Sequence, residues 1–460
     1  MNRTGKTRAR LFTISLALLV LAGCGTTGER QARHEWERAY AARPESADSG
    51  GDDRIAPADI TLASLLEESV RSNRALQAKR EDWKAALDRV PQARALPDPN
   101  FTYAYFLQSV ETRVGPQNQR FGLAQSFPLF GKLGLRGEVA VHEANAAAAR
   151  FESARLALRE RVTKLWNELV YLEHAIAITE ENVALLESLE EVLLKEYASG
   201  RRSYAHVLKT QIEHGRLEDR VRTLRDRRNP LVQSLRAELD LPPSHDLVVP
   251  ASAAYTLPYE DDENVKALDA NPRIRELEAM IEKARAASDL AGKSAVPDLT
   301  LGVEYIVTDK SEVASPPDNG QDAAIAMASV RLPLWLGRYK AEKNEARARM
   351  RASEERLADE KNRLRAEWEL ALFEYRDHGR RIDLYDEVLV PRAEEMYETS
   401  TSSFMTGTSD FLDLIDAERT LLEFALARER AAADRANAGA ALERLAGGQA
   451  SSPLGKEDSP

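Results

Sequence analysis

The chain has 460 residues, of which 30% are charged and only 6% are aromatic. This composition is typical of long helices and coiled coils rather than of ordinary globular domains. A mean hydropathy of -0.46 excludes a membrane protein built from many spanning helices. The formal net charge of -11 argues against nucleic acid as a partner.

The N-terminus has the features of a secretion signal. Basic residues precede an apolar stretch at 11–22, which is too short to span a membrane stably. The stretch ends at Leu21-Ala22-Gly23-Cys24, which resembles the bacterial lipoprotein box and contains the only cysteine of the chain. We therefore interpret residues 1–23 as a lipoprotein signal peptide and Cys24 as a lipid anchor, because acyl chains on an N-terminal cysteine hold a protein at a membrane. A chance cysteine behind a signal sequence is the alternative.

The residues after this cysteine indicate the target membrane and the kind of segment that follows the anchor. In the lipoprotein pattern, a glycine such as Gly25 in place of aspartate indicates the outer membrane. Residues 24–57 are polar and rich in Gly, Asp, Arg and Pro. Such a segment buries too little apolar surface to fold, so we expect a flexible tether with at most a short helix near 34–42.

One unusual pattern occurs twice. The segment 95–101 (ALPDPNF) leads through alternating apolar and polar residues to 127–132 (FPLFGK). The segment 295–301 (AVPDLTL) leads in the same way to 332–338 (LPLWLGR). Self-similarity over so long a distance indicates a duplicated structural half rather than a solenoid repeat.

Each copy predicts a pair of strands, at 99–128 and at 298–332. The alternation gives each strand one apolar face over roughly 9–11 residues, as in an outer-membrane barrel. Soluble hairpins with one buried face are the alternative. The residues expected on the inward face are small or polar and indicate a wet lumen: Thr102, Ala104, Gly122, Ser126, Thr300, Gly302, Glu304 and Arg331.

Both copies continue into very long helices. No proline interrupts 132–199, which as one helix would extend about 100 Å. The second copy repeats this design from 337 to about 400, where Pro391 is expected to kink the helix. Helices should return at 203–239 and at 410–445, and Pro230 should bend the first of them.

These elements divide the chain into two repeats. The first repeat covers 58–240 and opens with a helix predicted at 61–93. A proline-rich, acidic connector follows at 241–262, the second repeat covers 263–446, and a tail of low order covers 447–460. The predicted fold class is therefore mostly α with a small β part.

The turns between outgoing and returning helices match in the two copies. Gly200 and Gly407 suit the left-handed position that ends a helix. Ser203 and Asp410 suit the N-cap of the helix that follows. Hairpin chemistry alone explains these residues, and a docking role for the exposed tips is an additional hypothesis.

Four strands cannot close a barrel, because the smallest single-chain examples have about eight. Open sheet edges are not tolerated in hydrocarbon. If the strands span a membrane, copies of the chain must join: two copies would supply about 8 strands and three copies about 12.

The order and duplication of these features resemble the TolC-type outer-membrane efflux channel family over roughly residues 60–446. The resemblance implies a homotrimer whose 12-stranded outer-membrane β-barrel is continued by a long α-helical coiled-coil tunnel in the periplasm. It also implies docking to a periplasmic adaptor (membrane fusion protein) and to an inner-membrane efflux pump of the RND type. The docking residues would be those at the two tips: Gly200, Arg201, Ser203, Gly407, Thr408 and Asp410. The run at 127–137 (FPLFGKLGLRG) is most similar to the heavy-metal efflux branch.

The resemblance also implies an entrance gate of acidic residues just past the second tip, where Asp413 and Asp416 stand. A ring of these carboxylates in a trimer would attract cations. The alternative is two solvated aspartates near a helix N-terminus, where negative charge is favourable in any case. The aromatic and basic residues of the family's constriction are not reproduced, because Phe404 and Ser409 stand in their places.

We find no catalytic constellation, no metal site and no cofactor motif in the sequence. There is no P-loop, and the glycines at 131, 134 and 137 do not have the spacing of a dinucleotide fingerprint. The seven histidines are scattered, and only His206 and His214 lie on neighbouring turns of one helix.

The sequence therefore predicts a channel and not an enzyme. We expect an outer-membrane component of a tripartite efflux system that exports substrates passively, anchored in the outer membrane by lipid and extending into the periplasm. The alternative is a non-conducting coiled-coil lipoprotein that acts as a scaffold of the cell envelope.

Overall fold

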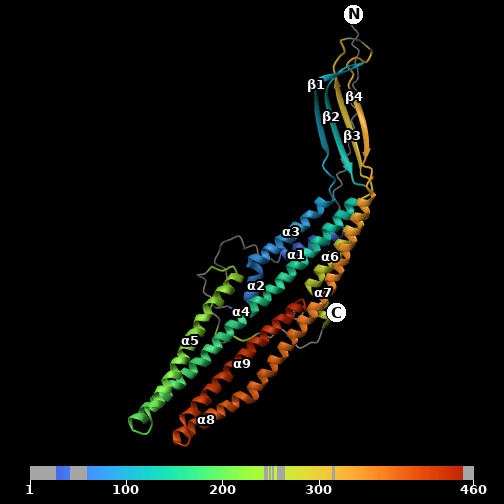
Figure 1. The fold of residues 1–460 in the computed structure, drawn as a ribbon. Coiled ribbons are helices and arrows are strands. Elements are labelled where there is room, and N and C mark those ends of the chain that lie inside the picture. The colour runs from blue at the N-terminus through green and yellow to red at the C-terminus, as the bar shows by residue number, and fades with distance from the viewer. Residues whose placement is uncertain are drawn as a thin grey trace, which may run out of the picture.

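The computed structural model describes residues 27–41, 60–242, 247, 250, 253–255, 265–312 and 316–448. The molecule is elongated and mostly helical, with one sheet at one end (Figure 1). Long helices lead away from the sheet, and two helical hairpins turn at the far end. This arrangement agrees with the predicted fold class. Among the described helices, none is apolar over a stretch long enough to cross a membrane.

The sheet contains both predicted strand pairs. β1 (Asn100–Thr112) and β2 (Gly115–Phe127) form the first hairpin, and β3 (Leu299–Thr308) and β4 (Ala323–Val330) form the second. All neighbours are antiparallel and lie in the order β1-β2-β3-β4. A tight turn joins β1 to β2, because Gly115 already pairs with Thr112 at the end of β1.

The single helix predicted at 61–93 is wrong. The structure has α2 (Leu62–Ser72) and α3 (Arg74–Arg94), separated at Asn73. The Asn73 side chain accepts a hydrogen bond from the Leu76 backbone amide at 3.0 Å. Asparagine offers backbone groups an alternative to helical bonding, so it ends one helix and caps the next.

The long helix of the first repeat is continuous. α4 (Lys132–Ala198) has 67 residues, which corresponds to about 100 Å at the rise of an α-helix. α5 (Tyr204–Glu238) returns along α4 and continues as one helix through Pro230. Small side chains of α4 such as Ala144 and Ala147 are buried in the core of this repeat. They allow the neighbouring helices to approach closely.

The second repeat comprises η3 (Val265–Ala270), α6 (Pro272–Gly292), α7 (Leu336–Leu384), α8 (Val390–Thr406) and α9 (Phe411–Leu445).

The predicted kink at Pro391 takes the form of a π-helical turn at Tyr385–Leu389. Proline lacks a backbone N–H, and its ring clashes with the carbonyl four residues earlier. The wider π turn accommodates both defects without ending the helix.

The flexible tether predicted at 24–57 is wrong for part of its length. α1 (Thr27–Ala41) packs along α3 and α4. The Glu29 carboxylate accepts a hydrogen bond from the Arg94 guanidinium at 2.7 Å, and Ala32 is 3% exposed. The expectation relied on the low mean hydropathy of the segment, whereas a few spaced contacts are sufficient to dock a helix.

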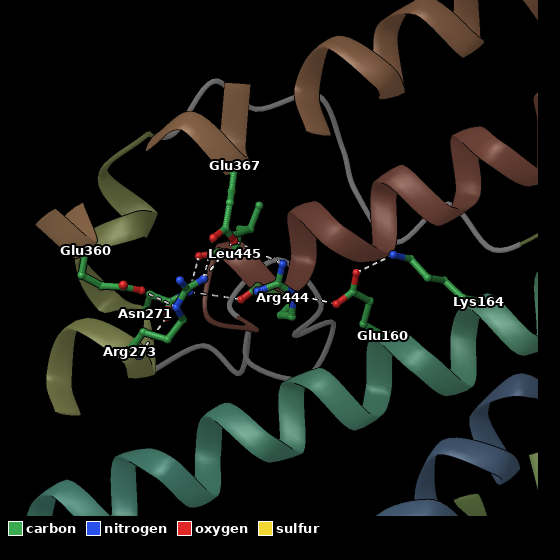
Figure 2. Close-up of polar contacts among 8 residues, drawn as sticks. All are labelled: Glu160, Lys164, Asn271, Arg273, Glu360, Glu367, Arg444 and Leu445. Atoms are coloured by element: carbon green, nitrogen blue, oxygen red, sulfur yellow. Dashed lines mark hydrogen bonds and ion pairs between the residues drawn. The ribbon is translucent and has the colours of Figure 1, made fainter. Parts of the chain in front are cut away.

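Equivalent hydrogen bonds connect the start and the end of each repeat. In the first, the Asn73 amide donates to the Glu238 carbonyl at 3.0 Å, where α5 ends. In the second, the Asn271 amide donates to the Leu445 carbonyl at 2.9 Å, where α9 ends (Figure 2). Each asparagine also caps the helix that follows it. One side chain therefore ties the start of each repeat to the end of its returning helix, and we call these residues the Asn clamps.

Ion pairs around the second Asn clamp join the two repeats (Figure 2). Arg444 of α9 contacts Glu160 of α4 at 2.6 Å and Glu367 of α7 at 3.6 Å. Arg273 at the start of α6 contacts the same Glu367 at 2.9 Å and also pairs with Glu360. Four helices are thereby connected through two guanidinium groups.

Candidate functional site: the sheet face and the helical tips

One face of the sheet is apolar and exposed. Phe101, Tyr103 and Tyr105 of β1 are 65%, 53% and 61% exposed, and their neighbours Leu123 and Val303 are 49% and 58% exposed. Side chains on one face of a sheet alternate with those on the other, so these residues form one patch. An exposed apolar patch of this kind marks a surface that meets hydrocarbon or another chain.

The opposite face carries the small and polar residues that the sequence placed in the lumen. Thr102, Gly122 and Glu304 lie side by side in the register, and Arg120 forms an ion pair with Glu304 at 3.8 Å. Four other predicted residues share this face: Ala104, Ser126, Thr300 and Gly302. Arg331 lies one residue beyond the end of β4.

Ile325 and Met327 of β4 also lie on the polar face, opposite Glu304 and Gly302. The sequence did not show this, because the strand reads AAIAMASV and its two faces are both apolar. Register, not composition, decides which of its residues face inward.

The sheet ends in two open edges, at β1 and at β4. Unpaired backbone N–H and C=O groups of an edge strand pair readily with another strand. They are incompatible with hydrocarbon if left unpaired. A single protomer is therefore incomplete as a membrane-spanning structure.

The hairpin tips lie at the end of the molecule opposite the sheet (Figure 1). Gly200 and Gly407 have φ values of 70° and 78°, as the turn prediction requires. Ser203 caps α5, and Asp410 caps α9 by accepting a hydrogen bond from its first backbone amide at 2.7 Å. The predicted hairpin chemistry is confirmed at both tips.

The six residues predicted to dock a partner are all exposed at these tips. Arg201 donates to the Ser199 hydroxyl at 3.0 Å, and Thr408 donates to the Ser403 carbonyl at 3.1 Å. These contacts stay within each turn, so they shape the tips and leave the surfaces accessible.

Arg202 links the two tips and was missed in the sequence. Its guanidinium lies over the ring of Phe404 at 4.1 Å, donates to the Phe404 carbonyl, and pairs with Glu196 at 3.0 Å. Phe404 is fully buried and Ser409 is half-buried. A lone arginine in a turn carries no sequence signal of a contact about 200 residues away.

The two gate candidates, Asp413 and Asp416, are exposed on α9, whereas Leu414 and Ile415 between them are buried. Both carboxylates therefore point away from the core of the protomer. Bringing several of them together requires more than one copy of the chain.

A buried carboxyl lies close to these aspartates. Glu418 is 3% exposed, and its burial together with the nearby Glu213 raises its pKa to about 7. Arg419 binds Glu213 instead, with Nε at 3.2 Å from the carboxylate. Glu418 was missed because a glutamate in a charged helical sequence looks like a solvated residue.

The sequence also singled out one cysteine and two histidines. Cys24 lies outside the described residues. The His206 ring stacks on Phe411 at 5.1 Å, and His214 lies 3.4 Å from Glu187. The described ranges contain no group of side chains that could hold a metal ion.

A comparison with known protein families identifies the family to which this fold belongs. The family model described as outer membrane efflux protein matches residues 65–238 and 265–448. The chain belongs to the outer membrane efflux protein family. The two matched segments fall on the two structural repeats, so the duplication is a property of the family fold. The family is one of outer-membrane transport channels, not of enzymes.

Solved structures of efflux channels share this fold. The outer membrane protein VceC from Vibrio cholerae is 20% identical with a TM-score of 0.70, over 84% of this chain and 96% of that one. The outer-membrane channel OprN is 19% identical with a TM-score of 0.72, over 89% and 96%. CusC is 14% identical with a TM-score of 0.72, over 88% and 97%. A search of curated protein sequences found no match.

These identities show the fold alone, and the predicted heavy-metal branch receives no specific support from them. CusC shares a smaller fraction of identical residues with this chain than VceC or OprN does. The assignment to that branch therefore stays a prediction.

Proposed function

We propose that this chain is the outer-membrane duct of a tripartite efflux system and passes substrates passively to the outside. The sheet carries the proposal, because it is apolar on one face, mostly small or polar on the other, and open at both edges. Three copies joined edge to edge would close a barrel of about 12 strands. The helices that leave the strands would continue this barrel into the periplasm.

Conductance in planar lipid bilayers tests the proposal. The purified protein should form stable channels, whereas a non-conducting envelope scaffold would form none. Val303→Arg places a charge on the apolar face and should reduce insertion, because it costs about 2–4 kcal/mol in the bilayer. Thr300→Arg, on the polar face of the same strand, is the matched control and should insert normally.

The proposed partners are two further copies of this chain, a periplasmic adaptor protein and an inner-membrane pump of the RND type. The exposed tips support adaptor docking at Gly200, Arg201 and Ser203 and at the corresponding residues of the second tip. Gly200→Pro or Gly407→Pro should abolish adaptor binding and leave trimers intact, since proline cannot adopt a positive φ. Co-purification of the adaptor at normal yield would contradict this, and Gly215→Ala in α5 is the control.

The entrance gate is proposed to contain Asp413 and Asp416. Their alanine variants should lower the cation selectivity of the channel, because they remove negative charge from its narrow end. The measurement is the reversal potential in a salt gradient. Asp219→Ala, an exposed aspartate of α5, is the control, and an unchanged reversal potential in the gate variants removes them from this role.

The lipid anchor is proposed at Cys24, in the outer membrane. Incorporation of labelled palmitate should require this cysteine and disappear in Cys24→Ala. Loss of the protein should also raise the sensitivity of an efflux-dependent strain to a toxic solute. A selective effect on metal cations would support the heavy-metal branch, and a selective effect on drugs or dyes would exclude it.

A further inference from the structure

The duplication relates the strands residue by residue. Pro297 follows Pro97 by 200 positions, so each residue of β3 corresponds to the β1 residue 200 positions earlier. Pro333 follows Pro128 by 205 positions, so β4 corresponds to β2 with that offset.

This correspondence can be checked within the protomer. In the first hairpin, Phe101 pairs with Leu123. Their counterparts are Leu301 and Ala328, and these two residues are paired in the second hairpin. The duplication therefore preserves the register of the hairpins without a shift.

The sheet contains one junction between the repeats, from β2 to β3, where Leu123 pairs with Val303. In a closed barrel the next junction runs from β4 to β1 of another copy. Because the two repeats correspond residue by residue, the junction between β4 and β1 should have the same strand register as the junction between β2 and β3. The counterpart of Leu123 is Ala328, and the counterpart of Val303 is Tyr103.

We propose that β4 pairs with β1 of a second copy in one defined register, with Ala328 opposite Tyr103 of the partner subunit. Ala326 then lies opposite Tyr105 of the partner subunit, and Val330 opposite Phe101 of the partner subunit. This inference rests on the proposed function, because it needs copies that close a barrel.

The side chains support this register in two ways. Ala326, Ala328 and Val330 lie on the same sheet face as the exposed aromatic residues of β1, so the apolar surface continues across the junction. A shift by one residue would turn every β4 side chain to the opposite face. The pairs also combine small residues with large ones, so the β1 rings gain room beside β4.

A second contact supports the same junction. Where β2 passes into α4, the Lys132 ammonium binds Asp298 at 2.8 Å, and the lysine side chain is only 8% exposed. This ion pair crosses from the first repeat to the second. The second copy has one extra residue, Leu336, between its proline and its glycine, so Arg338 is the counterpart of Lys132. The counterpart of Asp298 is Asp98, and Arg338 and Asp98 are both exposed in the protomer. In the barrel, Arg338 would bind Asp98 of the partner subunit.

Cysteine pairs test the register, because the chain has no cysteine besides Cys24. Ala328→Cys combined with Tyr103→Cys should give disulfide-linked dimers and trimers after mild oxidation of the membrane-inserted protein. Ala328→Cys combined with Ala104→Cys should give roughly tenfold fewer, because a one-residue slip places the thiols on opposite faces. The wild-type chain measures the background from Cys24.

The matched positive control is Leu123→Cys with Val303→Cys, the equivalent pair inside one chain. It should form an intrachain disulfide and no linked oligomers. Stronger linkage of position 328 to position 104 than to position 103, or no interchain linkage while this control is oxidised, would overturn the register.

Charge reversal tests the ion pair independently. Asp98→Lys alone and Arg338→Glu alone should lower the temperature at which trimers dissociate on gels, and the double variant should restore it. Failure of the double variant to recover would overturn the contact. A protein that conducts and is trimeric but fails these tests retains the proposed function, whereas a stably monomeric protein loses the function itself.

Discussion

The two returning helices, α5 and α9, have the same length and corresponding positions but very different surroundings. Each has 35 residues, yet six are buried in α5 and 17 in α9. α5 packs mainly on α4 and meets α9 through a few side chains such as His206 on Phe411, whereas α9 lies among α4, α7 and α8 (Figure 1). Duplication has therefore preserved the element and its turn, while the neighbours decide how much of it becomes core.

The two sequences follow these surroundings. α9 is rich in alanine where it is enclosed, and Ala433 and Ala436 are fully buried. The matching part of α5 is a run of Arg and Asp at 225–228, of which 225–227 are exposed. Small residues allow close helix packing on several sides, whereas long charged residues suit one open side.

The two tips are 207 residues apart at Gly200 and Gly407, so Leu208 of α5 corresponds to Ile415 of α9. The largest difference should appear at this pair, because Ile415 is 5% exposed and Leu208 is 45% exposed. Ile415→Ala should lower the free energy of unfolding by about 3–4 kcal/mol, because it leaves a cavity in the core. Leu208→Ala should lower it by less than about 1 kcal/mol. Denaturant unfolding followed by circular dichroism measures both, and equal losses would mean that a neighbouring chain covers α5.

The next largest effect should come from the buried Glu418, whose counterpart in α5 is the neutral Gln211. The pKa of Glu418 is raised from 4.5 to about 7, so the folded state holds this proton more tightly than the unfolded state. Stability from this group is complete below about pH 4.5 and is lost as the pH rises to about 7. Glu418→Gln should thus stabilise the protein by about 3 kcal/mol at pH 8 and have little effect at pH 4.5.

The control for this prediction is Glu423→Gln on the exposed side of α9, which should not change the pH dependence. Unfolding midpoints measured from pH 4.5 to 8 provide the comparison. An unchanged profile in the Glu418 variant would show that the carboxyl is hydrated in solution.

The smallest effect should be the same in both repeats. Asn73→Ala and Asn271→Ala each remove a helix cap and leave a carbonyl at the end of the returning helix without its side-chain donor. We expect each to cost about 2 kcal/mol of unfolding free energy. Gln92→Ala, which removes an exposed bond within α3, is the control. Very unequal losses would show that the two Asn clamps are not equivalent.

The sequence predicted those features of the fold that depend only on residues close together in the chain. Alternation located the strands, glycine and the following caps located both tips, and Pro391 located the break before α8. What it missed depends on contacts between distant segments. The docking of α1 through Glu29 and the burial of Glu418 each depend on a neighbour that no local pattern reveals.

The residues of the candidate site also fall into those that a local pattern predicts and those that depend on distant contacts. Ser203 and Asp410 could be placed because capping is local, whereas Arg202 depends on a contact with the other hairpin. Ile325 and Met327 could not be assigned to a face, because both faces of their strand are apolar.

The unbroken course of α4 has a mechanical consequence. A rod of about 100 Å that pivots by about 3° at one end sweeps its other end through about 5 Å. Slight reorientation beside the sheet is thereby magnified at the distant turn by leverage alone. The π turn ahead of α8 interrupts the corresponding rod of the second repeat, so bending there can absorb the same movement.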